Sequence, residues 1–530
     1  MLLRADVKKG NGNNMKKGFI SILLVVTLLL TLASCGAMAS DSGMNFAPSA
    51  EADADGNFSY NIVDESLMDV ATGTILPEHY GKFLENEFIS TEEENVSTFS
   101  ADVDTASYAY FRNLVNSGYS LSELIATAGR SIRTEEMVNY FNYNYPEPKD
   151  TELFSTTATI AACPWNEEAK LLVLGLQADR IELAQKNNLV FLIDVSGSMN
   201  SPKKLDLLKK AFAHLTDKLG ADDTVSIVTY SGKEAVVLEG CSGSKQDKIL
   251  RAVNSLKAGG STNGEAGLKK AYQLAEEYYI SGGNNRIILA SDGDLNVGIN
   301  SVEELKSFVS EKRESGVFLS VLGFGTGNYK DEKMETIADC GNGVYYYIDS
   351  ETEAEKVFGA DIFSTLYTVA KDVKLQLTFN ADYIQSYRLV GYENRLLNKE
   401  DFADDTKDAG ELGAGHSVTV CYELIFTDAE TQPEGGYIME LDVRYKDPNG
   451  EKSKLEEYNF GSEIITNSPN DNFKFITAVI ETSMIIHESE YIGEITLEDI
   501  KAELDALRLS DDEYKEQFRS LIQELINNNR

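Results

Sequence analysis

Three separate stretches of the chain place oxygen-bearing side chains directly after apolar runs. The stretch NNLVFLIDVSGSMN puts Asp194, Ser196 and Ser198 at alternate positions. Thr262 lies in the glycine-rich stretch KAGGSTNGEAGL, and Asp292 ends the apolar run RIILASD. Hard divalent cations such as Mg²⁺ select oxygen ligands of this kind. The residue types therefore predict a divalent-cation site, provided that the fold brings the three stretches together.

Each of these residues also has an ordinary structural explanation. Asp194, Ser196 and Ser198 could cap the helix expected near Lys204, because short oxygen side chains are favoured at helix N-termini. Thr262 could cap the next helix in the same way. An aspartate before glycine, as at position 292, is a common turn former. A cation site and a set of caps and turns are therefore the two interpretations to be separated.

The elements that must position these residues alternate in type from Asn187 to about Tyr347. Apolar strands between amphipathic helices indicate a parallel sheet buried on both faces, as in a doubly wound α/β domain. Such sheets bind ligands at the carboxyl ends of their strands, where the strand order reverses. The expected strands are NLVFLID, TVSIVTY, RIILASD, VFLSVLGFG and GVYYYID, and the expected helices are Lys204–Leu219, Lys245–Leu256, Gly264–Tyr279, Val302–Glu314 and Lys330–Ala338.

Strand-like alternation also occurs on both sides of this α/β region. It covers Leu153–Ile181 before it, and after an expected helix at Glu353–Val369 it resumes in VKLQLTF, SYRLVGYE, SVTVCYELIF, YIMELDVRY and KLEEYNF. The first flank is too short to bury a core alone, which favours one β-sandwich with the α/β domain inserted in it. Two separate small β units are the alternative. Helices are expected at Asn472–His487 and Leu497–Asn527.

The five oxygen-bearing residues occur in the order of the D-x-S-x-S, Thr and Asp segments of the metal-ion-dependent adhesion site (MIDAS) of von Willebrand factor type A (VWA) domains. The stretches STFSADVDTASYAYFRNLV and YRLVGYENRLLNKEDFADD resemble the N-terminal and conserved C-terminal regions of bacterial VWA-domain lipoproteins. The stretch LIATAGRSIRTEEM departs from that family, which usually has a proline-containing turn there. The resemblance implies a Rossmann-like VWA fold inserted in or flanked by a β-sandwich.

The same resemblance implies how the site works. Asp194, Ser196, Ser198, Thr262 and Asp292 would hold Mg²⁺, or another divalent cation such as Ca²⁺ or Mn²⁺. A coordination position left open would then accept an Asp or Glu carboxylate of a protein partner. The expected function is metal-dependent binding, adhesion or scaffolding.

The N-terminus has the layout of a secretory signal. Met15-Lys16-Lys17 is followed by an apolar run from Phe19 to Ala33, and Leu32-Ala33-Ser34-Cys35 resembles a bacterial lipobox. Cleavage before Cys35 and acylation of Cys35 are expected, with an uncleaved signal anchor as the alternative. The lipid would hold the protein in the cell envelope, at the outer surface of the cytoplasmic membrane or in the outer membrane.

The chain is expected to divide into seven segments. These are a signal peptide (1–34), a flexible tether (35–84), a von Willebrand factor N-terminal region (85–150), a β flank (151–186), a VWA domain (187–350), a helix with a β-sandwich flank (351–465) and C-terminal helices (466–530).

Composition narrows the function further. The formal net charge of −38 disfavours nucleic acid as a partner. No nucleophile elbow, P-loop or H-E-x-x-H motif is present, so a non-enzyme is expected. A regulatory subunit or metal-dependent enzyme of the envelope is the alternative, and a structural lipoprotein with a vestigial site is a third reading. Besides Cys35, the cysteines lack a C-x-x-C pair and are expected to be buried free thiols: Cys163, Cys241, Cys340 and Cys421.

Overall fold

The computed structural model describes the chain from position 84 onward with short gaps, plus four earlier residues. The described ranges are 68–69, 74–75, 84–149, 152–180, 186–231, 234–260, 264–293, 302–325, 331–360, 367–428, 436–448 and 450–529. They fall into two units, Met1–Tyr80 and Gly81–Arg530. In the first unit, β1 (Met68–Asp69) pairs antiparallel with β2 (Thr74–Ile75). Cys35, the signal segment and most of the expected tether lie outside the described residues.

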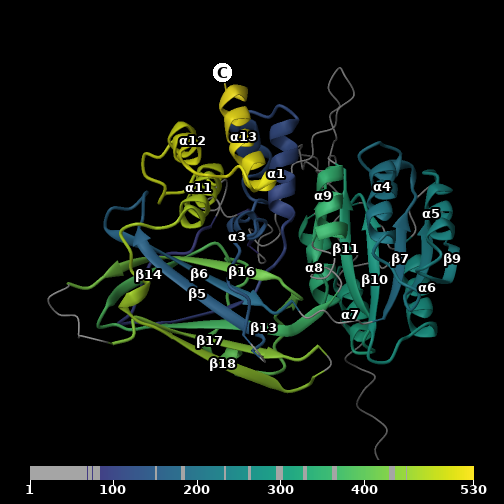
Figure 1. The fold of residues 1–530 in the computed structure, drawn as a ribbon, viewed down its shortest axis with the longest axis horizontal. Coiled ribbons are helices and arrows are strands. Elements are labelled where there is room, and N and C mark those ends of the chain that lie inside the picture. The colour runs from purple at the N-terminus through teal and green to yellow at the C-terminus, as the bar shows by residue number, and fades with distance from the viewer. Residues whose placement is uncertain are drawn as a thin grey trace, which may run out of the picture. The chain divides into compact units, whose positions relative to one another are not determined.

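The α/β region forms one six-stranded sheet in the order β12-β11-β10-β7-β8-β9 (Figure 1). β7, β8, β10, β11 and β12 run parallel, as predicted, whereas β9 pairs antiparallel with β8. β9 was not among the predicted strands: its apolar run is only four residues long, and the strand is largely exposed or half-buried. The bounds are β7 (Asn187–Asp194), β8 (Thr224–Tyr230), β9 (Ala235–Ser242), β10 (Asn284–Ser291), β11 (Phe318–Phe324) and β12 (Tyr345–Ile348).

Helices cover both faces of this sheet, which explains the apolar strands. Every residue of β7 and of β10 is buried. α4 (Leu205–Thr216) repeats apolar residues at helical spacing and buries Leu208, Phe212 and Leu215. The other helices are α5 (Gln246–Asn254), α6 (Glu265–Glu277), α7 (Val302–Arg313), α8 (Asp331–Cys340) and α9 (Glu351–Glu355).

The flanks form a sandwich of two five-stranded sheets. One has the order β15-β13-β17-β18 with β4 paired to β13, and the other has the order β3-β14-β16-β6-β5. Strands from before the α/β unit pair with strands that follow it, so its predicted insertion in a β-sandwich is confirmed. The bounds are β3 (Ile89–Ser90), β4 (Val96–Ser100), β5 (Phe154–Ala162), β6 (Ala169–Ala178), β13 (Thr368–Phe379), β14 (Ile384–Val390), β15 (Gly410–Gly413), β16 (Ser417–Phe426), β17 (Met439–Lys446) and β18 (Ser453–Phe460).

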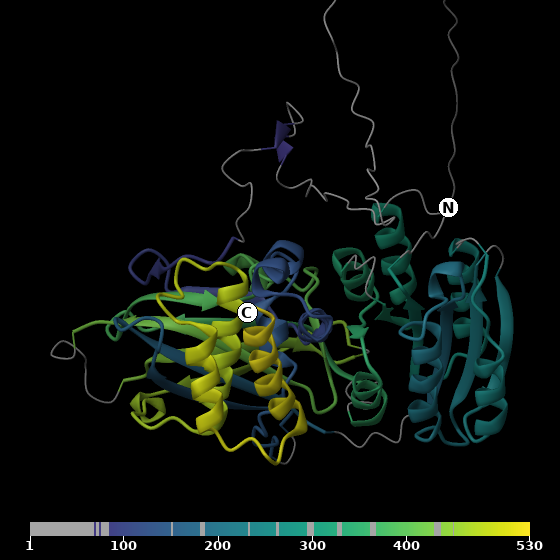
Figure 2. The same ribbon diagram turned by 90° about the horizontal axis from the view of Figure 1, so that it is seen from above.

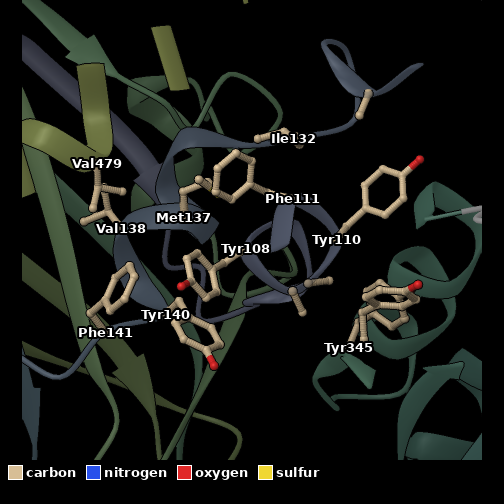
Figure 3. Close-up of a cluster of buried hydrophobic side chains, with 14 of the residues drawn as sticks. Tyr108, Tyr110, Phe111, Ile132, Met137, Val138, Tyr140, Phe141, Tyr345 and Val479 are labelled. Carbon is tan, nitrogen blue, oxygen red and sulfur yellow. The ribbon is translucent and has the colours of Figure 1, made fainter. Parts of the chain in front are cut away.

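Two groups of helices, from opposite ends of the chain, lie together over the sheet that contains β6 and β16 (Figure 1, Figure 2). Tyr108 stacks on Tyr140 at 4.0 Å within the first group, and Phe141 joins this group to the second by meeting Phe475 edge-on at 4.8 Å. Figure 3 shows this cluster, with Tyr345 of the α/β unit beside it. The helices are α1 (Ala106–Asn116), α2 (Leu121–Ala128), α3 (Thr134–Asn139), α11 (Asp471–Ile486), α12 (Leu497–Ala506) and α13 (Glu513–Asn528).

Two expected helices differ from the structure. The helix expected at Glu353–Val369 begins earlier, at Glu351: α9 passes into a π-helical turn at Lys356–Ala360, and the end of the expected range, from Thr368, belongs to β13. The single helix expected at Leu497–Asn527 is broken after Ala506. A second helix, α13, starts at Glu513, because the side chain of its N-cap residue Asp512 accepts hydrogen bonds from the backbone N–H groups of Tyr514 and Lys515.

The domain boundaries given above stay predictions. Along the described residues, no helix combines the length and the apolar character that a membrane crossing requires.

Candidate metal centre

The candidate site lies at the point where the strand order reverses. The chain passes from β7 to β8 on one side and later returns to β10 on the other, so β7 and β10 are neighbours. They pair in parallel register up to Ile193 opposite Ala290. Asp194 ends β7 and Asp292 directly follows β10, so both carboxylates emerge at the same edge of the sheet. This is the place where doubly wound sheets bind ligands.

The loop after β7 folds back on its own aspartate. The backbone N–H of Ser196 donates to Asp194 Oδ1 at 2.7 Å, and Asp194 is fully buried. The Ser196 and Ser198 hydroxyls lie 2.8 Å apart in hydrogen-bonding contact. The loop thus holds one carboxylate and two hydroxyls at alternate positions, as the sequence predicts.

The glycine-rich stretch before Thr262 is joined to this loop by backbone hydrogen bonds. Gly197 N–H donates to the Gly260 carbonyl at 3.1 Å, and Gly259 N–H donates to the Val195 carbonyl at 2.8 Å. Thr262 itself lies outside the described residues, so its predicted ligand role stays a prediction.

Two carboxylate oxygens carry the case for a cation. Asp194 Oδ2 and Asp292 Oδ1 are both buried and lack a hydrogen-bond partner within the part of the chain that the structure describes. Burial, together with a smaller contribution from the Asp292 charge, raises the pKa of Asp194 to about 6, although the hydrogen bonds from Ser196 and the nearby Tyr230 hydroxyl oppose the shift. Buried carboxylates are costly unless a cation or donors compensate them. The donor set therefore fits a divalent cation.

Tyr230 lies against the Asp194 side of the two carboxylates. It lies opposite Asp194 across the β7–β8 register, and its pKa is raised by burial and then by the Asp194 charge. Its buried hydroxyl lies close enough to the Asp194 carboxylate and the Ser291 side chain to interact with both, although it makes no hydrogen bond of good geometry among the described residues. Tyr230 therefore shields Asp194 from solvent without neutralising it.

Lys204 is a residue of the site that the sequence analysis did not find. Its Nζ donates to Asp292 Oδ2 at 2.9 Å and to the Ser198 carbonyl at 3.1 Å. In the structure Lys204 is the N-cap residue of α4, where short oxygen side chains are preferred and a cation opposes the helix dipole. Its contact with the site depends on residues far away in the sequence, so no local pattern predicts it.

A second acidic cluster lies elsewhere in the molecule. One oxygen each of Asp102, Glu136 and Glu335 lie within 4.8 Å of one another, and all three residues are buried. Arg133 contacts Glu136 at 3.0 Å and Glu335 at 2.8 Å. Arg395 contacts Asp102 at 3.2 Å and Glu335 at 2.8 Å. Two arginines thus already occupy this group.

A third group of carboxylates is more exposed. Glu440, Asp442 and Glu457 face one another across β17 and β18. Burial and the two neighbouring charges raise the pKa of Asp442 to about 6. Because acidic groups at a protein surface commonly stay solvated, this group alone does not define a site.

Three protein-family models match consecutive parts of the chain. A von Willebrand factor model matches residues 75–173, a von Willebrand factor type A domain model matches residues 188–360, and a model of the C-terminal region of the uncharacterised protein YfbK matches residues 364–527. With the sheet topology above, they define the class: this is a VWA-domain protein. Proteins of this class are typically adhesion or protein-interaction scaffolds, and their VWA domains commonly bind a divalent metal at a MIDAS.

The particular family follows from a curated relative. The chain is 38% identical to the uncharacterised protein YfbK of Escherichia coli (strain K12) over 470 residues, which are 84% of this chain and 80% of the relative. The chain therefore belongs to the YfbK family. The resemblance to bacterial VWA-domain proteins is confirmed, while the lipid anchor stays a prediction.

More distant similarities are confined to part of the chain or to general shape. Human inter-alpha-trypsin inhibitor heavy chain H3 is 27% identical over 46% of this chain and 29% of its own length. Among solved structures, a von Willebrand factor type A protein from Catenulispora acidiphila aligns with a TM-score of 0.39 and 18% identity, over 64% of this chain and 80% of that one.

Proposed function

We propose that this protein uses a divalent cation, held between β7 and β10, to capture an acidic group of a protein partner. The observation that carries the proposal is the pair of buried, unpartnered oxygens Asp194 Oδ2 and Asp292 Oδ1 at the switch point of the sheet. Two carboxylates so placed match the charge of one divalent cation.

The proposed ligands are the five residues predicted from the sequence. Asp194 and Asp292 supply charge, and Ser196, Ser198 and Thr262 supply hydroxyl oxygens. Mg²⁺ is the expected ion, with Ca²⁺ or Mn²⁺ as alternatives. When bound, the cation offers an electrophilic coordination position to a carboxylate of the partner. The protein's own part is to hold its oxygens in place and to exclude water behind them, which the buried Tyr230 supports.

The proposal includes a tether to a membrane. Acylation of Cys35 would anchor the chain in the cell envelope, at the outer surface of the cytoplasmic membrane or in the outer membrane. The residues between Cys35 and position 84 are rich in small, polar and acidic types, which suits a spacer. Labelling of the expressed protein with a radioactive or clickable fatty acid tests this part, and Cys35→Ala is expected to abolish the label.

A metal titration tests the central part. Mn²⁺ binding to the full chain is followed by electron paramagnetic resonance, and one site is expected. Asp194→Ala should abolish binding, whereas Asp217→Ala, an exposed acid at the end of α4, should leave it unchanged. Absence of Mn²⁺ and Mg²⁺ binding in the unsubstituted protein would overturn the proposal.

A pull-down from envelope extract tests the proposed partner. Immobilised protein should retain a partner in the presence of Mg²⁺ and release it with EDTA. The Asp194→Ala variant should retain none. Capture that persists in EDTA and in the variant would argue against metal-dependent binding.

A further inference from the structure

The side chain of Lys204 is built into the candidate metal centre. It starts at the N-cap position, just before α4, and ends between the loop after β7 and the segment after β10. Its side chain is 17% exposed, and that of its partner Asp292 is 1% exposed. A lysine this enclosed differs from the solvated lysines of a helix surface, such as Lys210 on the same helix, which is 58% exposed.

The neighbouring chain makes room for the lysine stem at Gly325. Gly325 follows β11 with φ +91, a conformation that favours glycine, and a Cβ there would lie 2.2 Å from Lys204 Cε. The Gly325 carbonyl accepts a hydrogen bond from the Tyr347 hydroxyl, which fixes this backbone. The path of Lys204 is therefore set by residues outside its own helix.

The two oxygens of Asp292 have different surroundings. Oδ2 accepts the Lys204 ammonium at 2.9 Å, whereas Oδ1 is buried without a partner among the residues that the structure describes. The ammonium also reaches the Ser198 carbonyl, so one cation joins both halves of the site. Oδ1 is therefore the Asp292 oxygen that faces no donor among the described residues, while Oδ2 lies beside a positive charge.

The charge of Lys204 also changes the net charge of the metal-loaded site. Asp194 and Asp292 would fully neutralise a divalent cation. With Lys204 added, the cation-loaded site keeps one positive charge. In a buried site that excess repels the cation itself and attracts an anion at the remaining coordination position.

We propose that Lys204 is a specificity-determining residue of this site: it weakens the hold on the divalent cation and strengthens the preference of the loaded site for a carboxylate. This inference rests on the proposed function, because it assigns a role to Lys204 within the same metal site. It adds a residue outside the ligand set predicted from the sequence.

The test compares three lysine variants of the full chain by Mn²⁺ titration. Lys204→Met removes the charge and keeps the apolar stem, and it should bind Mn²⁺ ~10-fold more tightly or better. Lys204→Arg keeps the charge and should stay near the unsubstituted protein. Lys203→Met is the matched control: Lys203 donates to Asn113 of α1 rather than to Asp292, so its loss should leave affinity unchanged.

A second readout uses acetate as the carboxylate probe. Acetate is titrated into each Mn²⁺-loaded variant and followed by water-proton relaxation. Lys204→Met should bind acetate roughly 3-fold more weakly or worse, because the excess charge is gone. Lys203→Met should not differ from the unsubstituted protein.

The outcomes separate this inference from the function on which it rests. If the unsubstituted protein binds Mn²⁺ and Asp194→Ala does not, but Lys204→Met binds both Mn²⁺ and acetate like the unsubstituted protein, the role of Lys204 is wrong and the site stands. Weaker Mn²⁺ binding by Lys204→Met would equally overturn it. If the unsubstituted protein binds no Mn²⁺, both proposals fall.

Discussion

Two of the buried acidic clusters among the described residues differ in what their oxygens contact. At the strand ends, Asp194 Oδ2 and Asp292 Oδ1 have no partner among the described residues. The other cluster consists of Asp102, Glu136 and Glu335. Each of its carboxylate oxygens contacts a donor, which is Arg133, Arg395 or a backbone N–H. The comparison teaches that buried carboxylates indicate a cation site only when their oxygens lack donors from the protein.

The second cluster therefore acts as a structural connection. Arg133 lies just before α3, Glu335 belongs to α8 of the α/β unit, and Arg395 follows β14. Their ion pairs join the inserted unit to the regions on both sides of it. Such a connection stabilises the assembly but offers nothing to a ligand.

The largest expected effect is on metal affinity, at the pair Asp194 and Asp292. Asp194→Ala removes one of only two charged ligands and should reduce Mn²⁺ affinity by roughly 1000-fold or more. Calorimetric or resonance titration measures it. Urea unfolding, followed by the fluorescence of the single tryptophan, Trp165, measures stability. The free energy of unfolding should not fall, because in the metal-free protein Asp194 is a buried acid that no cation compensates.

The next largest effect is on stability, at the arginine-bound cluster of Asp102, Glu136 and Glu335. Arg395→Met leaves Asp102 and Glu335 buried without their shared cation and should lower the free energy of unfolding by about 4 kcal/mol. Urea unfolding measures it. Mn²⁺ affinity should stay within a factor of about 2 of the unsubstituted protein, since Arg395 contacts neither Asp194 nor Asp292. A large loss of Mn²⁺ binding would mean that the two clusters are not independent.

A third case sharpens the comparison: a buried acid without any cation. Neither oxygen of Glu481, in α11, has a hydrogen-bond partner among the described residues, and burial raises its pKa to about 8. Because the pKa is higher in the folded state, its contribution is fully present at low pH and is lost as pH rises toward 8.

Glu481→Gln mimics the protonated acid and should remove that dependence. Between pH 5 and pH 8 the unsubstituted protein should lose about 3 kcal/mol of stability relative to this variant. Urea unfolding at several pH values measures the difference. Parallel pH profiles of the two proteins would show that Glu481 is ionised in the folded state.

The smallest effect is expected at an exposed ion pair. Lys210 and Glu351 lie 2.6 Å apart, but both side chains are more than half exposed. Lys210→Ala should lower the free energy of unfolding by only a small fraction of the Arg395→Met loss, because water screens the pair. A loss as large as that of Arg395→Met would contradict the view that burial decides the strength of these contacts.

Local patterns in the sequence predict much of this architecture. The apolar runs that end at Asp194 and Asp292 predict buried strands of one parallel sheet, and the structure places both in that sheet and pairs β7 with β10. The strand patterns on both flanks predict one sandwich, and β6 pairs with β16 across the insertion. These predictions succeed because each strand carries its own apolar signal.

Other features depend on contacts between distant residues. β3 and β4 are short, and only their pairing with β14 and β13 makes them strands. Lys204 joins the site through Gly325 and Asp292, both far away in the sequence. Arg395 finds Glu335 only because the α/β unit is inserted beside it. No local pattern announces such a contact.

The most direct test of the central claim is an anomalous-scattering map from crystals grown with Mn²⁺. The account predicts a peak within coordination distance of Asp194 and Asp292, and none at Asp102, Glu136 and Glu335. A peak at the arginine-bound cluster, or none beside Asp194 at saturating Mn²⁺, would contradict it.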